Sequence, residues 1–150
     1  AGPEDRILDL FCGLGNFSLP LARAAGEVLG VELDQSLVDA ARSNAMANGI
    51  GNAHFLAADL MQSVDNLAWM QQRFDGVLID PPRSGAAEIL PLVAATRASR
   101  IVYVSCDPAT LARDAGTLVN EYGYTLERAG VADMFPHTAH VESLALFGRK

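Results

Sequence analysis

The residue best suited to covalent chemistry in this sequence is Cys106. It follows the apolar run 100–105, which is typical of a buried strand, and precedes Asp107-Pro108, which is typical of a helix start. Between a strand end and a helix N-terminus, free backbone N–H groups favour the reactive thiolate, whereas the Asp107 carboxylate opposes it. Cys106 is therefore a candidate nucleophile, and the ordinary alternative is a buried structural cysteine.

Carboxylates gather at the ends of other apolar runs that are typical of strands. These acids are Asp9, Glu32, Asp59 and Asp80, in or just after the runs 6–10, 27–32, 53–57 and 74–80. The carboxyl ends of parallel strands share one edge of a sheet, and ligands of open α/β sheets bind there. We therefore expect the acids and the thiol on one edge, although each acid alone could be a solvated strand end or a helix cap.

The turn after the first run contains Gly13 and Gly15, which let the backbone turn sharply and approach a ligand closely. Such turns occur in NAD enzymes and in enzymes that use S-adenosylmethionine (SAM). A carboxylate at Asp9 would repel a pyrophosphate but attract the ammonium and sulfonium groups of SAM. Glu32 suits ribose hydroxyls, and Asp59 suits the exocyclic amine of adenine. These residues favour SAM over NAD.

Helical patterns separate the first five strands. We expect helices at 16–25, 35–48, 60–73, 86–97 and 108–121. This alternation predicts an α/β fold with a mostly parallel, seven-stranded sheet and helices on both faces. The last two strands, expected at 124–131 and 141–149, have no helix between them, so we expect the final strand to be antiparallel. Its first residues, Glu142 among them, would then lie on the same edge as Cys106.

The segment Asp80-Pro81-Pro82-Arg83 allows two further interpretations. Amino-group methyltransferases use Asp or Asn, then Pro-Pro, then an aromatic residue that stacks on the target base. Arg83 stands at the aromatic position, so the stacking partner is missing, and that chemistry would need no thiol. The structural alternative is a rigid turn that caps the next helix.

The composition restricts the class of protein. The chain has 150 residues, half of them hydrophobic, which is enough for one domain with a core. Its net charge of -7 argues against a self-sufficient nucleic-acid-binding module, but it allows a catalytic domain whose RNA is gripped elsewhere. Two cysteines and three histidines, His137 and His140 among them, suggest neither a disulfide framework nor a metal site. No signal peptide or membrane span is recognisable, so we expect a cytoplasmic protein.

Four segments together resemble the RNA uracil-5-methyltransferase family, and most closely its bacterial branch that acts on 23S ribosomal RNA. They are residues 9–17 (DLFCGLGNF), 80–83 (DPPR), 105–114 (SCDPATLARD) and 133–143 (DMFPHTAHVES). The resemblance covers essentially the whole chain, and the segments around Cys106 and Glu142 are its most specific parts. It implies a Rossmann-like class I SAM-dependent methyltransferase fold.

The resemblance also implies roles for individual residues. Cys106 matches the nucleophile of the family, and Glu142 matches its general base. The SAM-site positions of the family are matched by Phe11, Asn16, Glu32, Asp59 and Asp80. Several family members have Asn where this chain has Asp59 or Asp107. The first change keeps an acceptor for adenine.

The implied reaction transfers a methyl group from SAM to C5 of a uridine, with addition of Cys106 at C6 and elimination assisted by Glu142. The alternative outside catalysis is a SAM-binding domain that is inactive in isolation. The N-terminal RNA-binding barrel of the family and the cysteines that hold an iron–sulfur cluster in this branch are missing from the sequence. We therefore expect residues 1–150 to be a monomeric catalytic domain from a longer protein, in which another domain grips the RNA.

Overall fold

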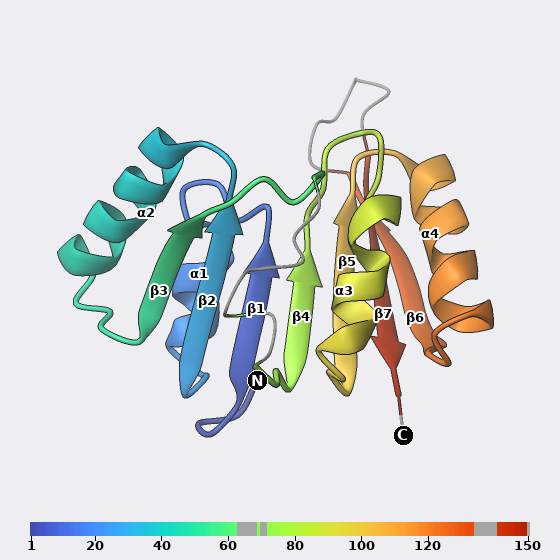
Figure 1. Ribbon diagram of the computed structural model, residues 1–150, viewed down its shortest axis with the longest axis horizontal. Helices are drawn as coiled ribbons and strands as arrows, with labels where there is room; N and C mark the ends of the chain where they lie inside the picture. Colours follow the sequence, from blue (N-terminus) through green and yellow to red (C-terminus); the bar gives the residue numbers. More distant parts are fainter. Residues whose placement is uncertain (63–68, 70–71, 134–140, 150) are drawn as a thin grey trace.

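The computed structural model describes residues 1–62, 69, 72–133 and 141–149, and it contains one seven-stranded sheet (Figure 1). The spatial order of the strands is β3-β2-β1-β4-β5-β7-β6. In chain order they are β1 (Arg6–Leu10), β2 (Glu27–Glu32), β3 (Ala53–Ala57), β4 (Gly76–Ile79), β5 (Arg100–Ser105), β6 (Thr125–Ala132) and β7 (Glu142–Gly148). The α/β fold with a mostly parallel sheet is confirmed.

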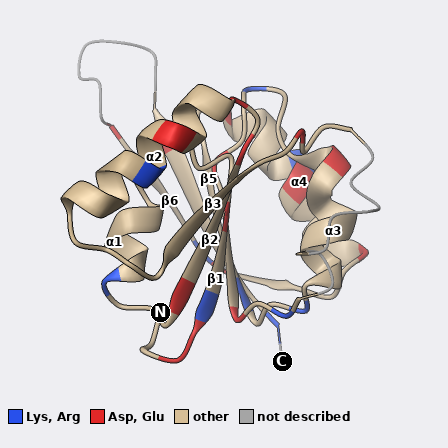
Figure 2. Cartoon of the chain, turned by 60° about the vertical axis from the view of Figure 1, so that its left-hand side comes forward, with Lys and Arg blue, Asp and Glu red and all other residues tan. Residues whose placement is uncertain are grey.

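Helices cover both faces of the sheet, as predicted. In Figure 2, α1 and α2 lie on one side of the strands, and α3 and α4 lie on the other. The described helices are α1 (Ser18–Ala22), α2 (Gln35–Ala47), the 3₁₀ turn η2 (Ala87–Ile89), α3 (Leu90–Ala95) and α4 (Pro108–Asn120). The two long helices begin at aspartates whose side chains accept backbone N–H groups of the first turn. None of the described helices is long and apolar enough to cross a membrane.

Three of the expected helices are shorter than predicted, divided, or mostly outside the described residues. The pattern at 16–25 gives a helix only from Ser18 to Ala22, because the preceding residues form a tight turn closed by the bond from Gly15 N to Cys12 O. The pattern at 86–97 is divided into η2 and α3, because Pro91 lacks an N–H and fits only the first turn of a helix. Most of the helix expected at 60–73 lies outside the described residues.

The strand order reverses between β1 and β4. Both strands are parallel and paired from Ile7↔Gly76 to Leu10↔Ile79, and the chain runs from β1 outward to β2 and β3 before it returns to β4. In open α/β sheets such a reversal opens a crevice at the carboxyl ends of the two strands, where ligands bind. The turn after β1 and the residues after β4 are therefore the expected walls of a ligand site.

The final strand β7 is antiparallel to both of its neighbours, β5 and β6. Its register against β5 runs from Arg100↔Gly148 to Ser105↔Ser143. The beginning of β7 therefore lies at the carboxyl end of β5. This confirms the predicted direction of the final strand.

Candidate active site at the carboxyl edge of the sheet

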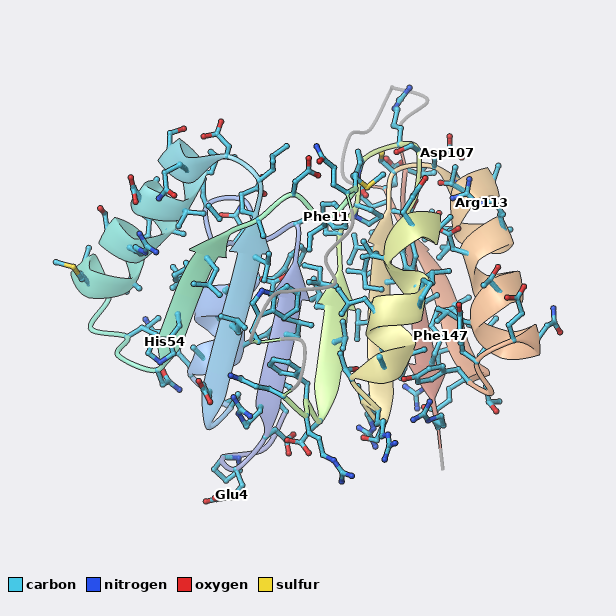
Figure 3. The ribbon with its side chains drawn as sticks, in the orientation of Figure 1. Glu4, Phe11, His54, Asp107, Arg113 and Phe147 are labelled. Carbon is cyan, nitrogen blue, oxygen red and sulfur yellow. The ribbon has the colours of Figure 1, made fainter. Side chains whose placement is uncertain are left out.

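The turn that follows β1 is built around residues with positive φ. Phe11, Gly13 and Gly15 have φ angles of 64°, 53° and 85°. A Cβ on Gly15 would lie 3.3 Å from the Phe55 ring, so a side chain would be both strained and crowded there. Phe11 is not a glycine, and the left-handed conformation of a bulky residue is a strain that is often found at functional sites. Figure 3 shows Phe11 near the carboxyl edge, between β1 and β4.

Glu32, at the end of β2, ties this turn to the neighbouring strand. Its Oε2 accepts the N–H of Gly13 at 3.0 Å, and its Oε1 accepts those of Leu33 at 2.8 Å and Asp34 at 3.2 Å. The partly exposed carboxylate is therefore held in place by backbone donors. The ribose-binding role of Glu32 stays a prediction, and the anchoring of the turn by Glu32 was not predicted from the sequence.

Asp9, in β1, is completely buried. Its Oδ2 accepts the hydroxyl of Ser18 at 2.5 Å, and its Oδ1 has no hydrogen-bond partner among the described residues. Burial, with a smaller contribution from the nearby charge of Asp80, raises the pKa of Asp9 to about 7, although the Ser18 bond opposes this shift. Ser18 was not identified from the sequence, because a serine in a first helical turn is an ordinary occurrence.

Asp59, which follows β3, makes local contacts. Its Oδ1 accepts the N–H of Met61 and its Oδ2 accepts the side-chain amide of Gln62, both at 2.9 Å. This matches the cap-like alternative that the sequence left open. Asn16, another predicted cofactor residue, is exposed in the glycine turn.

Two carboxylates and the thiol stand at the ends of three neighbouring strands, β4, β5 and β7. Because Ser105 pairs with Ser143, the next residue along β5 and the preceding residue along β7 lie beside each other. These residues are Cys106 and Glu142. On the other side of β5, burial and then the charge of Glu142 raise the pKa of Asp80. The carboxylate of Glu142 is therefore close enough to Asp80 to disfavour ionisation of the Asp80 carboxyl group.

The two cysteines have different surroundings. Cys106 is partly exposed and immediately precedes Asp107, whose side chain accepts the N–H groups of Ala109 at 2.9 Å and Thr110 at 3.3 Å. The predicted cap of α4 is thereby confirmed. Cys12 is buried, and burial together with the charges of Asp9 and Glu32 raises its pKa to about 12. Of the two thiols, only that of Cys106 is accessible for nucleophilic attack.

The edge therefore contains two groups of predicted residues. Phe11 and Gly13 lie in the turn after β1, which Glu32 anchors, while Cys106 and Glu142 occupy neighbouring backbone positions at the ends of β5 and β7. Asp80 stands after β4, between the two groups. The histidines at 137 and 140 lie outside the described residues.

Among the described residues, no group of three His, Cys, Asp or Glu side chains is arranged so that it could hold a metal ion. Two cysteines, one of them buried behind the glycine turn, also do not fit the four thiolate positions of an iron–sulfur cluster.

The known proteins that this chain resembles are RNA methyltransferases. The chain is 63% identical over 150 residues to the 23S rRNA (uracil(1939)-C(5))-methyltransferase RlmD of Xanthomonas oryzae pv. oryzae, and 60% identical over 149 residues to RlmD of Stenotrophomonas maltophilia. It spans 34% of the length of these relatives.

Among solved structures, the chain resembles the tRNA (uracil-54, C5)-methyltransferase of Pyrococcus abyssi in complex with S-adenosyl-L-homocysteine. The TM-score is 0.80 and the identity 33%, over 96% of this chain and 34% of that one. The family model for tRNA (uracil-5-)-methyltransferases matches residues 2–150. The chain therefore belongs to the tRNA (uracil-5-)-methyltransferase family.

Proposed function

We propose that this chain is the catalytic domain of a SAM-dependent methyltransferase that modifies C5 of a uridine in 23S ribosomal RNA. The observation that carries the proposal is the pairing of Ser105 with Ser143, because it brings an accessible thiol and a carboxylate to one point of the ligand-binding edge. The names of the Xanthomonas and Stenotrophomonas relatives support the choice of ribosomal RNA.

The residues at the strand-order reversal fit SAM as the methyl donor. Gly13 has open space where a side chain would be, and the carboxylate of Glu32 is fixed beside it by backbone donors. Asp9 is buried in β1 with one unpartnered oxygen and a raised pKa, and a cationic ligand nearby would favour its ionised form. We infer that the donor is held by Phe11, Asn16, Glu32, Asp59 and Asp80.

When bound, SAM supplies a methyl group on a positively charged sulfur. Uracil C5 is a poor nucleophile, and covalent catalysis overcomes this by dividing the reaction into easier steps. The Cys106 thiolate forms a bond to C6, and the electrons of the C5–C6 double bond move onto C5 and the neighbouring carbonyl as an enolate. C5 is then nucleophilic enough to accept the methyl group, and the electrons of the broken carbon–sulfur bond stay on the sulfur, which leaves as the neutral thioether S-adenosylhomocysteine.

The methylated adduct must lose the proton that remains on C5. Glu142 accepts this proton, the C5–C6 double bond forms again, and the C6–S bond breaks to release the thiolate. Asp80, whose raised pKa reflects burial and the charge of Glu142, would position the polar edge of the uracil or the donor. The base must leave its stack or loop to reach this edge.

Trapping the covalent adduct tests the proposal. The protein is incubated with SAM and an RNA that contains 5-fluorouridine, in which fluorine replaces the proton that Glu142 must remove. We expect a stable protein–RNA adduct that carries one added methyl group and maps to Cys106 by peptide mass spectrometry. The same RNA with uridine should give free protein and methylated RNA. Methylation of an exocyclic amino group without an adduct would instead support the Asp80-Pro81-Pro82 chemistry.

Replacing Glu32 by alanine should weaken SAM binding by about 1–3 kcal/mol, because hydrogen bonds to the ribose and the anchor of Gly13 are both lost. Isothermal titration calorimetry measures the change. Glu27→Ala is the matched control, since Glu27 lies at the other end of β2 and pairs with Arg6 at 2.8 Å. Equal SAM affinity in the Glu32 variant, or binding of NADH and not SAM by the wild type, would refute the assignment of the turn.

The 150-residue chain alone should bind RNA weakly. Its net charge is -7, and three of its arginines, Arg6, Arg42 and Arg113, are paired with carboxylates. Phosphate contacts need clustered Lys and Arg, and Figure 2 shows acidic and basic residues interspersed along the ribbon. Fluorescence anisotropy with a ribosomal RNA fragment at two salt concentrations measures the affinity. Tight binding that falls steeply with salt would contradict this expectation.

A further inference from the structure

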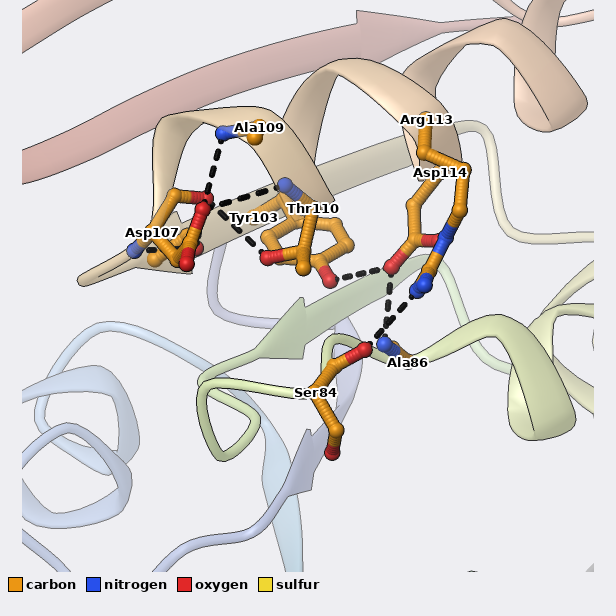
Figure 4. Close-up of polar contacts among 9 residues, drawn as sticks. Ser84, Ala86, Tyr103, Asp107, Ala109, Thr110, Arg113 and Asp114 are labelled. Carbon is orange, nitrogen blue, oxygen red and sulfur yellow. Dashed lines mark hydrogen bonds and ion pairs between the residues drawn. The ribbon is translucent and has the colours of Figure 1, made fainter.

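A buried carboxylate joins the loop after β4 to the helix that follows Cys106. Asp114, in α4, is only 1% exposed. Its Oδ2 accepts the Tyr103 hydroxyl at 2.6 Å and the N–H of Ala86 at 2.7 Å, while its Oδ1 accepts Nε of Arg113 at 2.8 Å (Figure 4). Three donors from β5, from the loop after β4 and from α4 itself therefore meet at one side chain.

Arg113 extends the connection to the same loop. Its Nη2 donates to the carbonyl oxygen of Ser84 at 2.9 Å, so two successive contacts hold residues 84–86 against α4. Between them, Gly85 has a φ of 86°. A Cβ on Gly85 would overlap the Arg113 guanidinium and would lie 2.7 Å from Oδ2 of Asp114, so the close approach of loop and helix requires glycine.

The chain segments on either side of this connection are stiff. Pro81 and Pro82 follow Asp80 directly, and the fixed φ angles of proline leave few soft dihedrals between Asp80 and Ser84. A turn closed by the bond from Gly85 N to Pro82 O, at 2.9 Å, restricts the rest of the loop. On the other side, the thirteen-residue helix α4 begins two residues after Cys106. A displacement at residues 84–86 is therefore transmitted toward both Asp80 and Cys106.

Packing alone does not account for a carboxylate at this position. Asp114 lies on the buried stripe of α4 with Leu111 and Leu118, where an apolar residue would pack without the desolvation that a buried charge requires. An apolar side chain at this position could not accept the hydrogen bond from the Ala86 N–H.

We propose that Asp114 is a positioning residue that fixes the separation between the Asp80 carboxyl group and the Cys106 thiol. The role in catalysis rests on the proposed function, since it requires a uracil held between these two residues. Asp114 itself touches neither substrate nor donor. It acts through the loop 84–86 on one side and through α4 on the other.

Hydrogen exchange and steady-state kinetics on Asp114→Ala test the proposal. Without the carboxylate, the amides of residues 84–86 should exchange at least about tenfold faster, because the Ala86 N–H loses its acceptor. The kcat for methyl transfer should fall by about 10- to 100-fold, as expected for a displacement of the reacting groups by an ångström or less. The KM values for RNA and SAM should change less than kcat does, because the glycine turn is untouched and Asp80 is one of five residues inferred to hold the donor.

Two substitutions separate positioning from general stability. Tyr124→Phe also removes a buried tyrosine hydroxyl bond, to Ala98 O at 2.9 Å, so it should lower the melting temperature but leave kcat unchanged. Asp114→Asn keeps one acceptor oxygen for the Ala86 N–H and should recover much of the lost kcat. If Asp114→Ala does not fold, Arg113→Lys is the second test, because Arg113 is half-exposed and its replacement removes the contact with Ser84. This variant should lower kcat and leave the KM values unchanged.

The outcomes distinguish the two proposals. If the amide hydrogens of residues 84–86 exchange at an unchanged rate in a folded Asp114 variant, Asp114 does not hold this loop against α4. This conclusion does not depend on the measured activity. Faster exchange with an unchanged kcat, or an equal loss of kcat in Tyr124→Phe, overturns the positioning role. A wild-type protein that does not methylate uridine C5 refutes the proposed function, and the exchange measurement still decides whether Asp114 holds the loop.

Discussion

Replacement of Cys106 by alanine should abolish methyl transfer to uridine, with a loss on the order of 10⁴-fold or more, because removal of a covalent nucleophile leaves only binding and positioning. SAM affinity should stay within about twofold, since the residues of the β1 turn are not altered. The partly exposed thiol contributes little to the core, so the melting temperature should change by only a few degrees. Transfer of radiolabelled methyl groups to RNA, together with calorimetry, measures both expectations.

Cys12→Ala is the matched control for this experiment. It removes the other thiol of the chain, which is buried beside the Phe55 ring and Gly30 and has no part in the proposed chemistry. This variant should retain activity, with a modest loss of stability from the small cavity. If Cys106→Ala continued to methylate RNA at a wild-type rate, catalysis would not depend on a thiol and the amino-group chemistry would be favoured.

Replacement of Glu142 by glutamine should stop the reaction after methyl transfer. An amide cannot accept the C5 proton, so the C6–S bond cannot break and the methylated RNA should stay attached to Cys106. The expected product is a protein–RNA complex that survives denaturing electrophoresis on ordinary uridine substrate and contains the labelled methyl group. Turnover should fall by about 10²–10⁴-fold, which is the usual contribution of a general base.

Two controls make this result specific. Glu121→Gln changes an exposed carboxyl group at the far end of α4 and should turn over normally without an adduct. The double variant Cys106→Ala/Glu142→Gln should give no adduct, because the attachment point is gone. Normal turnover by Glu142→Gln would show that another residue removes the proton.

Most strands and helices could be predicted because each depends on the pattern of apolar residues within its own short segment. Apolar runs defined the strands, and the lack of a helical period between the last two strands was enough to predict the direction of β7. The insertion of β7 between β5 and β6 was not predicted, since the order of strands depends on pairing between distant residues. The short α1 was also missed, because the turn geometry at Gly15 overrides a helical pattern that begins at Asn16.

The positions of the candidate site residues in the fold were predictable where these residues lie at strand ends. The proximity of Cys106 and Glu142 followed from the expected direction of the final strand. Residue types alone did not predict the local contacts of Asp59 or the complete burial of Asp9. An aspartate at a strand end looks the same in a sequence whether it binds a ligand or a backbone N–H. Asp114 did leave a signal, an acid on the apolar stripe of a helix between Leu111 and Leu118, but its partners are distant in sequence.

The position of β7 has a consequence for how the protein is made. The ribosome produces β5 and β6 before β7, yet β7 lies between them in the finished sheet. Until residues 142–148 have been synthesised, the carboxyl edge carries the thiol of Cys106 without the carboxylate of Glu142, and β5 lacks one of its two neighbours. Because pairing of distant strands is slow to form, we expect insertion of β7 to be a late event in folding, and until then the unpaired edge of β5 is open to association. A nascent chain therefore brings Cys106 and Glu142, the two proposed reacting residues, to one edge only in the step that closes the sheet.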